Sequence, residues 1–308
     1  MYLSTQQQKS IIMDQKKEPM EACIRNLKRR NIRAAVKQWR ILRKLSGEST
    51  ETLISDMGKI IDESYQRNSE NLAHITDFIH KCVSKSDRLL KEAAYDYLIQ
   101  EMESGDHFSD KKIIPEILEF THTMKIDLQD FYNSSTTTEE IVNRLPETLK
   151  YLFFEKVKLI LTARGMLRAG TDRKVTLIPE DSKYHLETEV LWEFEFDRAK
   201  SDGTFYIKNE ETQKYLITVH EGFNSYGFSK QSLLLTRNKK QSGTAFKIEG
   251  ATKDTSQKLL IRSVLYNGYL TWKSNIQTIY GDDDSYFVLL DERLNGPSPY
   301  WHFKGKNE

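Results

Sequence analysis

The chain has 308 residues, of which 30% are charged and 38% are apolar, and its formal net charge is +1. These values are typical of a soluble globular protein with about two domains. They exclude a strong overall field that would draw the chain to nucleic acid, and no apolar run approaches the roughly 20 residues of a transmembrane segment.

The N-terminal region is polar, and we expect a flexible tail over residues 1–18. It contains no apolar h-region, so no signal peptide is expected. The two cysteines, Cys23 and Cys82, are too few for a disulfide scaffold. They would form one bridge in an extracellular protein or remain free thiols in an intracellular one.

A helical bundle domain is predicted over residues 19–152. Apolar residues recur at helical spacing in three segments, 49–64, 71–82 and 86–102. In the last of these, the spacing predicts one inward face with the residues Leu89, Leu90, Ala93, Tyr97 and Met102. Asn133 begins an Asn-Ser-Ser sequence, which is a glycosylation acceptor if the chain is secreted.

Residues 22–47 contain nine Lys or Arg and no acid, while apolar residues lie on the opposite arc of a helix. A basic amphipathic helix of this kind can dock on an anionic surface, for which the candidate residues are Arg29, Arg33, Lys37 and Arg40. The alternative is an ordinary surface helix, or two helices with a break near Asn31, whose basic face is solvated. No recognition motif for nucleic acid accompanies the run.

The second half shows three similar units, each with strand-like alternation, a tight break and a closing aromatic residue. The closing aromatics are Trp192, Phe246 and Trp301, at intervals of 54 and 55 residues. A period of this size indicates a repeat architecture, and three four-stranded units can close into a barrel with a cap of hairpins. We therefore predict an α+β multidomain protein with a C-terminal β-trefoil over residues 153–308.

Sugar binding beside a trefoil hairpin is a further hypothesis. The Asn-Gly pair at 267–268 is a strong hairpin signal, and we predict a carbohydrate pocket from Tyr266, Asn267, Trp272 and Asp284. The Gln-x-Trp pattern of ricin-type lectins is missing from all three units. The acidic run at 282–284 is interpreted as a surface turn, because it lacks the alternating ligands of a calcium loop.

Several segments resemble a known family. VLWEFEF at 190–196, YLFFEKVKLI at 151–160 and the closing YWHF at 300–303 resemble the insect low-molecular-weight (30-kilodalton) lipoproteins, which include microvitellogenin. The resemblance covers 141–304 well and 21–80 moderately, and 83–135 reads as an insertion. It implies a helical domain before a β-trefoil, and a non-enzymatic haemolymph storage protein that binds lipid or sugar.

Enzymatic function is not predicted. None of the seven histidines forms a metal-spaced pair, and the chain contains no nucleophile elbow, phosphate loop or dinucleotide fingerprint. We expect no catalytic residue, metal or cofactor. The first functional hypothesis is a secreted storage and ligand-binding protein of the insect lipoprotein type. The second is a cytoplasmic interaction module that docks on anionic surfaces through the basic segment 22–47.

Overall fold

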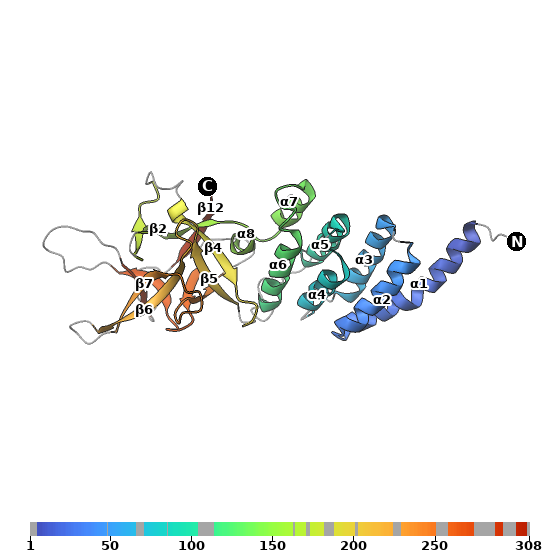
Figure 1. The fold of residues 1–308 in the computed structure, drawn as a ribbon, viewed down its shortest axis with the longest axis horizontal. Coiled ribbons are helices and arrows are strands. Elements are labelled where there is room, and N and C mark those ends of the chain that lie inside the picture. The colour runs from blue at the N-terminus through green and yellow to red at the C-terminus, as the bar shows by residue number, and fades with distance from the viewer. Residues whose placement is uncertain are drawn as a thin grey trace. The chain divides into compact units, whose positions relative to one another are not determined.

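The structure of the protein is a computed structural model (Figure 1). It describes residues 5–47, 49–65, 71–84, 86–103, 114–162, 164–170, 173–181, 188–200, 203–223, 229–250, 258–273, 287–291 and 300–306. The chain folds as two compact units, 1–145 and 146–308. The first unit is helical, and the second consists mainly of one antiparallel sheet, which confirms the prediction of a mixed α and β protein with the helices first.

The first unit is a stack of helices in two layers. Its described helices are α1 (Thr5–Lys28), α2 (Ile32–Leu45), α3 (Thr50–Ser64), α4 (Leu72–Cys82), α5 (Arg88–Glu103), α6 (Ile114–Leu128) and α7 (Thr136–Asn143). Helix α3 packs between α1 and α5, and α4 packs between α2 and α6. Figure 1 shows these helices following one another in chain order. Each apolar stripe is therefore buried mainly against helices close in sequence, which keeps most contacts local.

The basic segment forms two helices rather than one. The chain breaks between α1 and α2, where Arg30 has a φ of 58° and Asn31 caps α2 by accepting a hydrogen bond from Ala34 N at 3.2 Å. Asn is a preferred N-cap residue because its side chain satisfies an unpaired backbone N–H. Trp39 and Leu42 on the apolar arc of α2 are buried, as the spacing predicted.

The predicted flexible tail over 1–18 differs from the structure, because α1 already begins at Thr5. Lys16 forms an ion pair with Asp56 of α3 at 2.8 Å, and Met20 is buried in the core. The sequence pattern did not indicate this helix because its first half is polar. A contact to a distant helix, rather than a local apolar stripe, holds the segment.

Both cysteines of the first unit are free thiols, which is one of the two alternatives that the sequence left open. Burial raises the pKa of Cys23 to about 12. Burial likewise raises the pKa of Cys82, although the nearby Arg40 opposes the shift. Because the thiolate is the reactive form, both side chains are poor nucleophiles at neutral pH.

A fully buried ion pair links α5 to α6. Lys91 Nζ lies 2.6 Å from Asp127 Oδ1, and both side chains are at most 2% exposed. Tyr95 donates to the other carboxylate oxygen at 2.8 Å, and His80 Nδ1 lies 2.9 Å from Oδ1. Burial and the Asp127 carboxylate raise the pKa of Tyr95 well above its usual value. The lysine thus neutralises a carboxylate that three helices enclose.

We expect Lys91→Met to lower the free energy of unfolding by about 3–5 kcal/mol, because it leaves the buried Asp127 carboxylate without its lysine counterion. Urea unfolding followed by circular dichroism measures the change. Lys59→Met is the matched control, because Lys59 is 59% exposed and its ion pair to Glu63 lies on the surface. The control should change stability by less than about 1 kcal/mol. Equal effects of both variants would contradict a structural role for the buried pair.

The second unit contains twelve strands within the described residues: β1 (Val157–Leu161), β2 (Gly165–Ala169), β3 (Val175–Ile178), β4 (Leu191–Phe196), β5 (Thr204–Asn209), β6 (Tyr215–Phe223), β7 (Ser229–Thr236), β8 (Ala245–Glu249), β9 (Leu260–Ser263), β10 (Tyr269–Lys273), β11 (Phe287–Asp291) and β12 (Trp301–Gly305). The short helix α8 (Glu147–Phe153) precedes them. All pairings between named strands are antiparallel.

The pairings follow a path that returns to its start. Strand β12 pairs with β1, and the path continues through β4, β5 and β8 to β9. A bridge between Leu259 and Trp301 joins the beginning of β9 to β12. Three further hairpins, β2–β3, β6–β7 and β10–β11, branch from this path at β1, β5 and β9. The sheet is therefore curled, with the same pattern of pairings three times.

The three closing aromatics of the repeat are buried as predicted. Trp192, Phe246 and Trp301 have no exposed surface. The two indoles also make equivalent hydrogen bonds. Trp192 Nε1 donates to Leu167 O at 3.0 Å, and Trp301 Nε1 donates to Leu270 O at 2.9 Å. A buried indole N–H needs such a partner, so these bonds fix each ring against the second strand of its own unit.

Helix α8 belongs to the second unit, whereas the predicted boundary at 152/153 grouped it with the helices. The reason is an aromatic contact. The ring of Phe153 lies 5.8 Å from that of Phe196 and 5.7 Å from that of Phe205, in edge-on geometry. The packing partner of this short helix is therefore the sheet.

Phe246→Ala should lower the free energy of unfolding of the second unit by about 3–5 kcal/mol, because it opens a cavity in a fully packed layer. Guanidinium titration followed by tryptophan fluorescence measures the loss. Tyr300→Ala serves as an aromatic control, because this ring is 38% exposed. Its effect should stay below about 1 kcal/mol. A loss at Phe246 no larger than that at Tyr300 would argue against a shared aromatic core.

Candidate functional site

A pocket of about 480 Å³ lies on the second unit. It is lined by residues from three separate segments: Arg173, Lys214, Leu235, Thr236, Arg237 and Gln241. The segments are the start of the β3 region, the turn between β5 and β6, and the end of β7 with the loop that follows. Its volume is within the usual range for small-molecule sites, roughly 300–1,000 Å³.

Backbone pairing holds Arg173 at the rim of the pocket. Its φ is 70°, and its carbonyl accepts from Leu235 N at 2.8 Å. In return, Arg173 Nε donates to Leu235 O at 2.9 Å. The guanidinium is thus oriented by β7, and its terminal nitrogens are not used in this contact. Leu235 itself is fully buried, so this contact anchors the arginine to the core of the unit.

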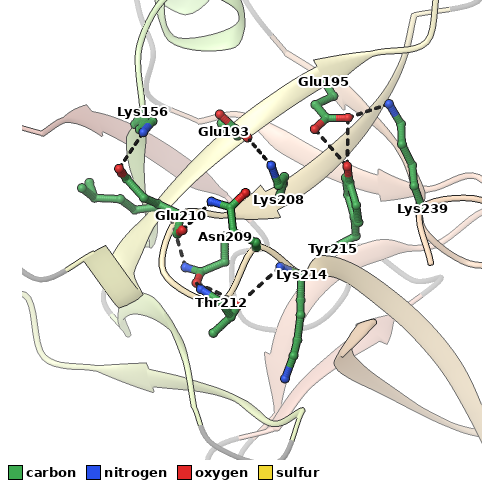
Figure 2. A network of polar contacts seen from close by, with 12 residues as sticks. Lys156, Glu193, Glu195, Lys208, Asn209, Glu210, Thr212, Lys214, Tyr215 and Lys239 are labelled. Atoms are coloured by element: carbon green, nitrogen blue, oxygen red, sulfur yellow. Dashed lines mark hydrogen bonds and ion pairs between the residues drawn. The ribbon is translucent and has the colours of Figure 1, made fainter. Parts of the chain in front are cut away.

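Asn209 orders the turn that carries Lys214. The amide of Asn209 is fully buried, and its Nδ2 donates to Glu189 O at 2.8 Å and to Leu191 O at 3.1 Å. Its Oδ1 accepts from the backbone N–H of Thr212 at 3.0 Å and from the hydroxyl at 3.1 Å. Figure 2 shows Lys214 leaving this turn with its ammonium group away from the dashed contacts. A side-chain amide that bonds its own turn is a common way to fix such a loop.

The third wall of the pocket is the loop after β7. The Thr236 hydroxyl donates to Gln241 Oε1 at 2.7 Å and accepts from Asn238 N at 3.2 Å. The carbonyl oxygen of Gln241 is therefore already occupied, and its NH₂ group is left for the pocket. Arg237, which is exposed, follows Thr236 directly. This wall therefore contributes hydrogen-bond donors to the pocket.

Beside the pocket, lysines and glutamates are matched one to one. Lys156 pairs with Glu210 at 2.6 Å, and Lys208 pairs with Glu193 at 3.1 Å (Figure 2). Glu195 holds the third lysine, Lys239, at 2.6 Å and also accepts from Tyr215. These ion pairs are partly exposed, so each contributes little to stability but cancels local charge.

Glu195 also affects the phenol of Tyr215. Partial burial, followed by the hydrogen bond to Glu195 and the charge of that carboxylate, raises the pKa of Tyr215 to about 12. The hydroxyl therefore remains a neutral donor throughout the physiological range and does not act as a base there.

The predicted carbohydrate residues are only partly described. Tyr266 and Asn267 lie in the turn between β9 and β10, where Asn267 has a φ of 54° and bonds the guanidinium of Arg262. Trp272 belongs to β10, but its side chain lies outside the described residues, as does Asp284 altogether. Tyr266 and Asn267 therefore lie in the same turn, and the carbohydrate pocket of all four residues stays a prediction.

The four candidate residues for anionic-surface binding, Arg29, Arg33, Lys37 and Arg40, are all exposed. No ion pair to any of them is found within the described ranges. The nearby acids that could have paired with them are engaged elsewhere: Asp56 with Lys16, and Glu63 with Lys59. Asn133, the predicted glycosylation acceptor, is exposed in the turn after α6.

No pattern in the sequence indicated the residues that line the pocket. Arg173, Lys214 and Arg237 are separated by up to 64 residues, because 237 − 173 = 64, and no local pattern connects them. The sequence feature that could have indicated this site is the basic stretch at 237–240, which follows an apolar strand.

None of the described helices is long and apolar enough to cross a bilayer. Among the same residues, no group of three or more His, Cys, Asp or Glu side chains is placed to hold a metal ion.

Comparisons with known proteins do not identify a family. The sequence matches no protein-family model and no curated protein. Among solved structures, the SDF2-like protein from Arabidopsis thaliana has 16% identity and a TM-score of 0.37, over 49% of this chain and 92% of that one. The Haemophilus ducreyi cytolethal distending toxin has 11% identity and a TM-score of 0.34, over 49% and 82%.

A third structure matches over most of this chain. The S. cerevisiae protein O-mannosyltransferase Pmt1–Pmt2 complex bound to the sugar donor has 10% identity and a TM-score of 0.36, over 97% of this chain and 51% of that one. Similarities at these TM-scores support no conclusion about this protein, so its function has to be argued from its own residues.

Proposed function

We propose that the second unit is a β-trefoil. The support is its pairing pattern: the same arrangement of four strands occurs three times, and the path of pairings returns from β12 to β1. The intervals of 54 and 55 residues between the buried aromatics agree with one residue of this kind in each unit. A ring of this kind removes exposed sheet edges.

We further propose that the protein is a non-enzymatic ligand-binding protein of the insect 30-kilodalton lipoprotein type, and that its ligand is a sugar or a lipid. The pocket on the second unit supports ligand binding. Two guanidinium groups, an ammonium group and an amide line it, together with Leu235 and Thr236. Such groups orient a ligand by hydrogen bonds, whereas guanidinium and ammonium groups do not act as bases at neutral pH.

The storage role and the haemolymph location belong to the same proposal and rest on the family resemblance. On this view the protein works outside the cell, without cofactor or metal. The cytoplasm is the alternative location if docking on an anionic surface is the function.

Isothermal calorimetry with a panel of monosaccharides, disaccharides and fatty acids tests the ligand-binding proposal. We expect at least one ligand to bind in a 1:1 ratio, and mass spectrometry should recover that ligand unchanged. Arg173→Ala removes an exposed guanidinium from the lining of the pocket and should weaken that binding, whereas Lys240→Gln on the neighbouring exposed loop should leave it intact. Conversion of a ligand into product would refute the non-enzymatic proposal, and a panel without any binder would refute ligand binding.

Docking on an anionic surface is a second candidate function, and the exposed cations of α1 and α2 favour it. Arg33, Lys37 and Arg40 lie at i, i+4 and i+7, and therefore on one face of α2. Like charges at such spacing destabilise a helix by about 0.2–0.5 kcal/mol per pair. This arrangement is unfavourable for the isolated chain, and an anionic partner would relieve it.

Vesicle co-sedimentation tests the second candidate. We expect vesicles rich in phosphatidylserine to retain the protein at low salt, because each cation near such a surface contributes about 1 kcal/mol. Changing Arg29, Arg33, Lys37 and Arg40 together to Gln should remove most of this binding. Thermal stability should stay the same or rise slightly, because repulsion along α2 is relieved.

A control for net charge is available in the second unit. Lys174, Lys240, Lys258 and Lys306 are exposed, and their change to Gln removes the same four charges. If this control lost vesicle binding equally, a non-specific charge effect would replace the proposed docking face. If the helix variant lost stability but kept vesicle binding, the basic face would be structural.

A further inference from the structure

We propose that the pocket on the second unit is an anion site that binds the phosphate or sulfate group of a small ligand. The contacts would come from the guanidinium groups of Arg173 and Arg237, the ammonium group of Lys214 and the amide NH₂ of Gln241. This inference rests on the proposed ligand-binding function and specifies the chemistry of the ligand.

The hydrogen-bonding capacity of the lining is the first argument. Arginine and lysine side chains have donors and no acceptor. Each of the two side-chain oxygens of the lining already accepts one hydrogen bond, Gln241 Oε1 from the Thr236 hydroxyl and the Thr236 hydroxyl from Asn238 N. The pocket therefore presents side-chain donors, and a ligand that satisfies them has to be rich in acceptors. A tetrahedral oxyanion has that property.

The local charge is the second argument. Around the pocket, Lys156, Lys208 and Lys239 each lie against a glutamate. Three lining residues form no ion pair within the part of the chain that the structure describes: Arg173, Lys214 and Arg237. None of the described lining residues is an acid. The described lining of the pocket thus carries three positive charges and no negative charge, although the chain as a whole is almost neutral, at +1.

Preorganisation is the third argument. Arg173 is held by two reciprocal bonds to Leu235, and its terminal guanidinium nitrogens are left for a ligand. Lys214 leaves a turn that the buried Asn209 fixes, and its ammonium group extends away from the other contacts of that turn (Figure 2). Groups that are oriented before binding lose less entropy when a ligand arrives, so affinity is higher.

The size of the pocket indicates a ligand larger than a free ion. A volume of about 480 Å³ leaves room beyond one oxyanion. A sugar ring that carries the anionic group would occupy this remaining space. We therefore expect the affinity of an anionic sugar ester to exceed that of inorganic phosphate or sulfate.

Calorimetry on the full-length protein tests the inference with five probes: glucose, glucose 6-phosphate, glucose 6-sulfate, inorganic phosphate and inorganic sulfate. We expect at least one of the two esters to bind at least about tenfold more tightly than glucose, because charge-assisted hydrogen bonds are added. Raising the salt concentration should weaken ester binding and leave any glucose binding unchanged, because the pocket is open to solvent.

The two esters are distinguished by pH. A phosphate monoester loses its second proton near pH 6, whereas a sulfate ester keeps one charge. Tighter binding of glucose 6-phosphate at about pH 8 than at about pH 5 assigns the site to phosphate. Equal affinity of glucose 6-sulfate at both values, with weaker binding of the phosphate, assigns it to sulfate.

Substitutions locate the binding. Lys214→Gln and Arg237→Gln together should weaken ester binding by at least about tenfold, since two charge-assisted contacts are lost. Lys240→Gln is the matched control: it removes an exposed lysine of the same loop that does not line the pocket. Circular dichroism should show unchanged folding for all variants, because the altered side chains are not part of the core.

The outcomes separate this inference from the broader proposal. If glucose or another neutral ligand binds but the esters bind no better, the anion site is refuted while ligand binding stands. If the esters bind equally to the double variant, binding lies elsewhere and the inference is likewise refuted. If none of the five probes binds but the wider ligand panel yields a neutral ligand, the anion site is refuted and the ligand-binding proposal stands.

Discussion

The pairing of the last strand with the first is the constraint on which the second unit depends. Strand β12 runs antiparallel to β1 over residues that are at least 140 positions apart, since 301 − 161 = 140 for the closest pair. Trp301 lies at this point and makes two contacts to the third unit: its backbone pairs with that of Leu259, and its indole N–H donates to the carbonyl of Leu270. Its ring is fully buried. Without this closure, β1 and β9 would expose free edges and the three hairpins would lose their common base.

The closure also explains where a binding site can form. In a curled sheet, the alternating positions inside are filled by packed side chains, so the interior offers no room for a ligand. The pocket lies instead where the beginning of the β3 region meets the end of β7, at contacts such as Arg173 to Leu235. Loops that a rigid scaffold positions are the usual place for binding residues.

The first unit is stabilised in a different way. Its helices bury apolar stripes against near neighbours, but α5 and α6 are also joined by the ion pair of Lys91 and Asp127. A buried pair of this kind is costly to break and tolerates few alternative packings. Helices α3 and α5 also approach closely at Gly58, where a Cβ atom would lie 2.6 Å from the ring of Tyr97.

The sequence by itself determined the type of each half. Helical spacing predicted the buried positions Leu53, Met57 and Ile60 of α3, and the recurrence of Trp192, Phe246 and Trp301 predicted three buried aromatics. Both are periodic patterns, and burial of one face of a regular element produces them directly. The break near Asn31 was one of two alternatives that the sequence left open, and the Asn31 cap of α2 selects it.

Only the tertiary structure decided which faces and which distant residues meet. The predicted inward face of α5 was wrong at Leu89 and Tyr97, which are 55% and 38% exposed, because the neighbouring helices select Lys91 and Tyr95 instead. Lys16 reaches Asp56 across 40 residues, and Arg173 approaches Arg237 through strand pairing. Such contacts leave no periodic trace in the sequence, since they depend on how elements pack rather than on how each element forms.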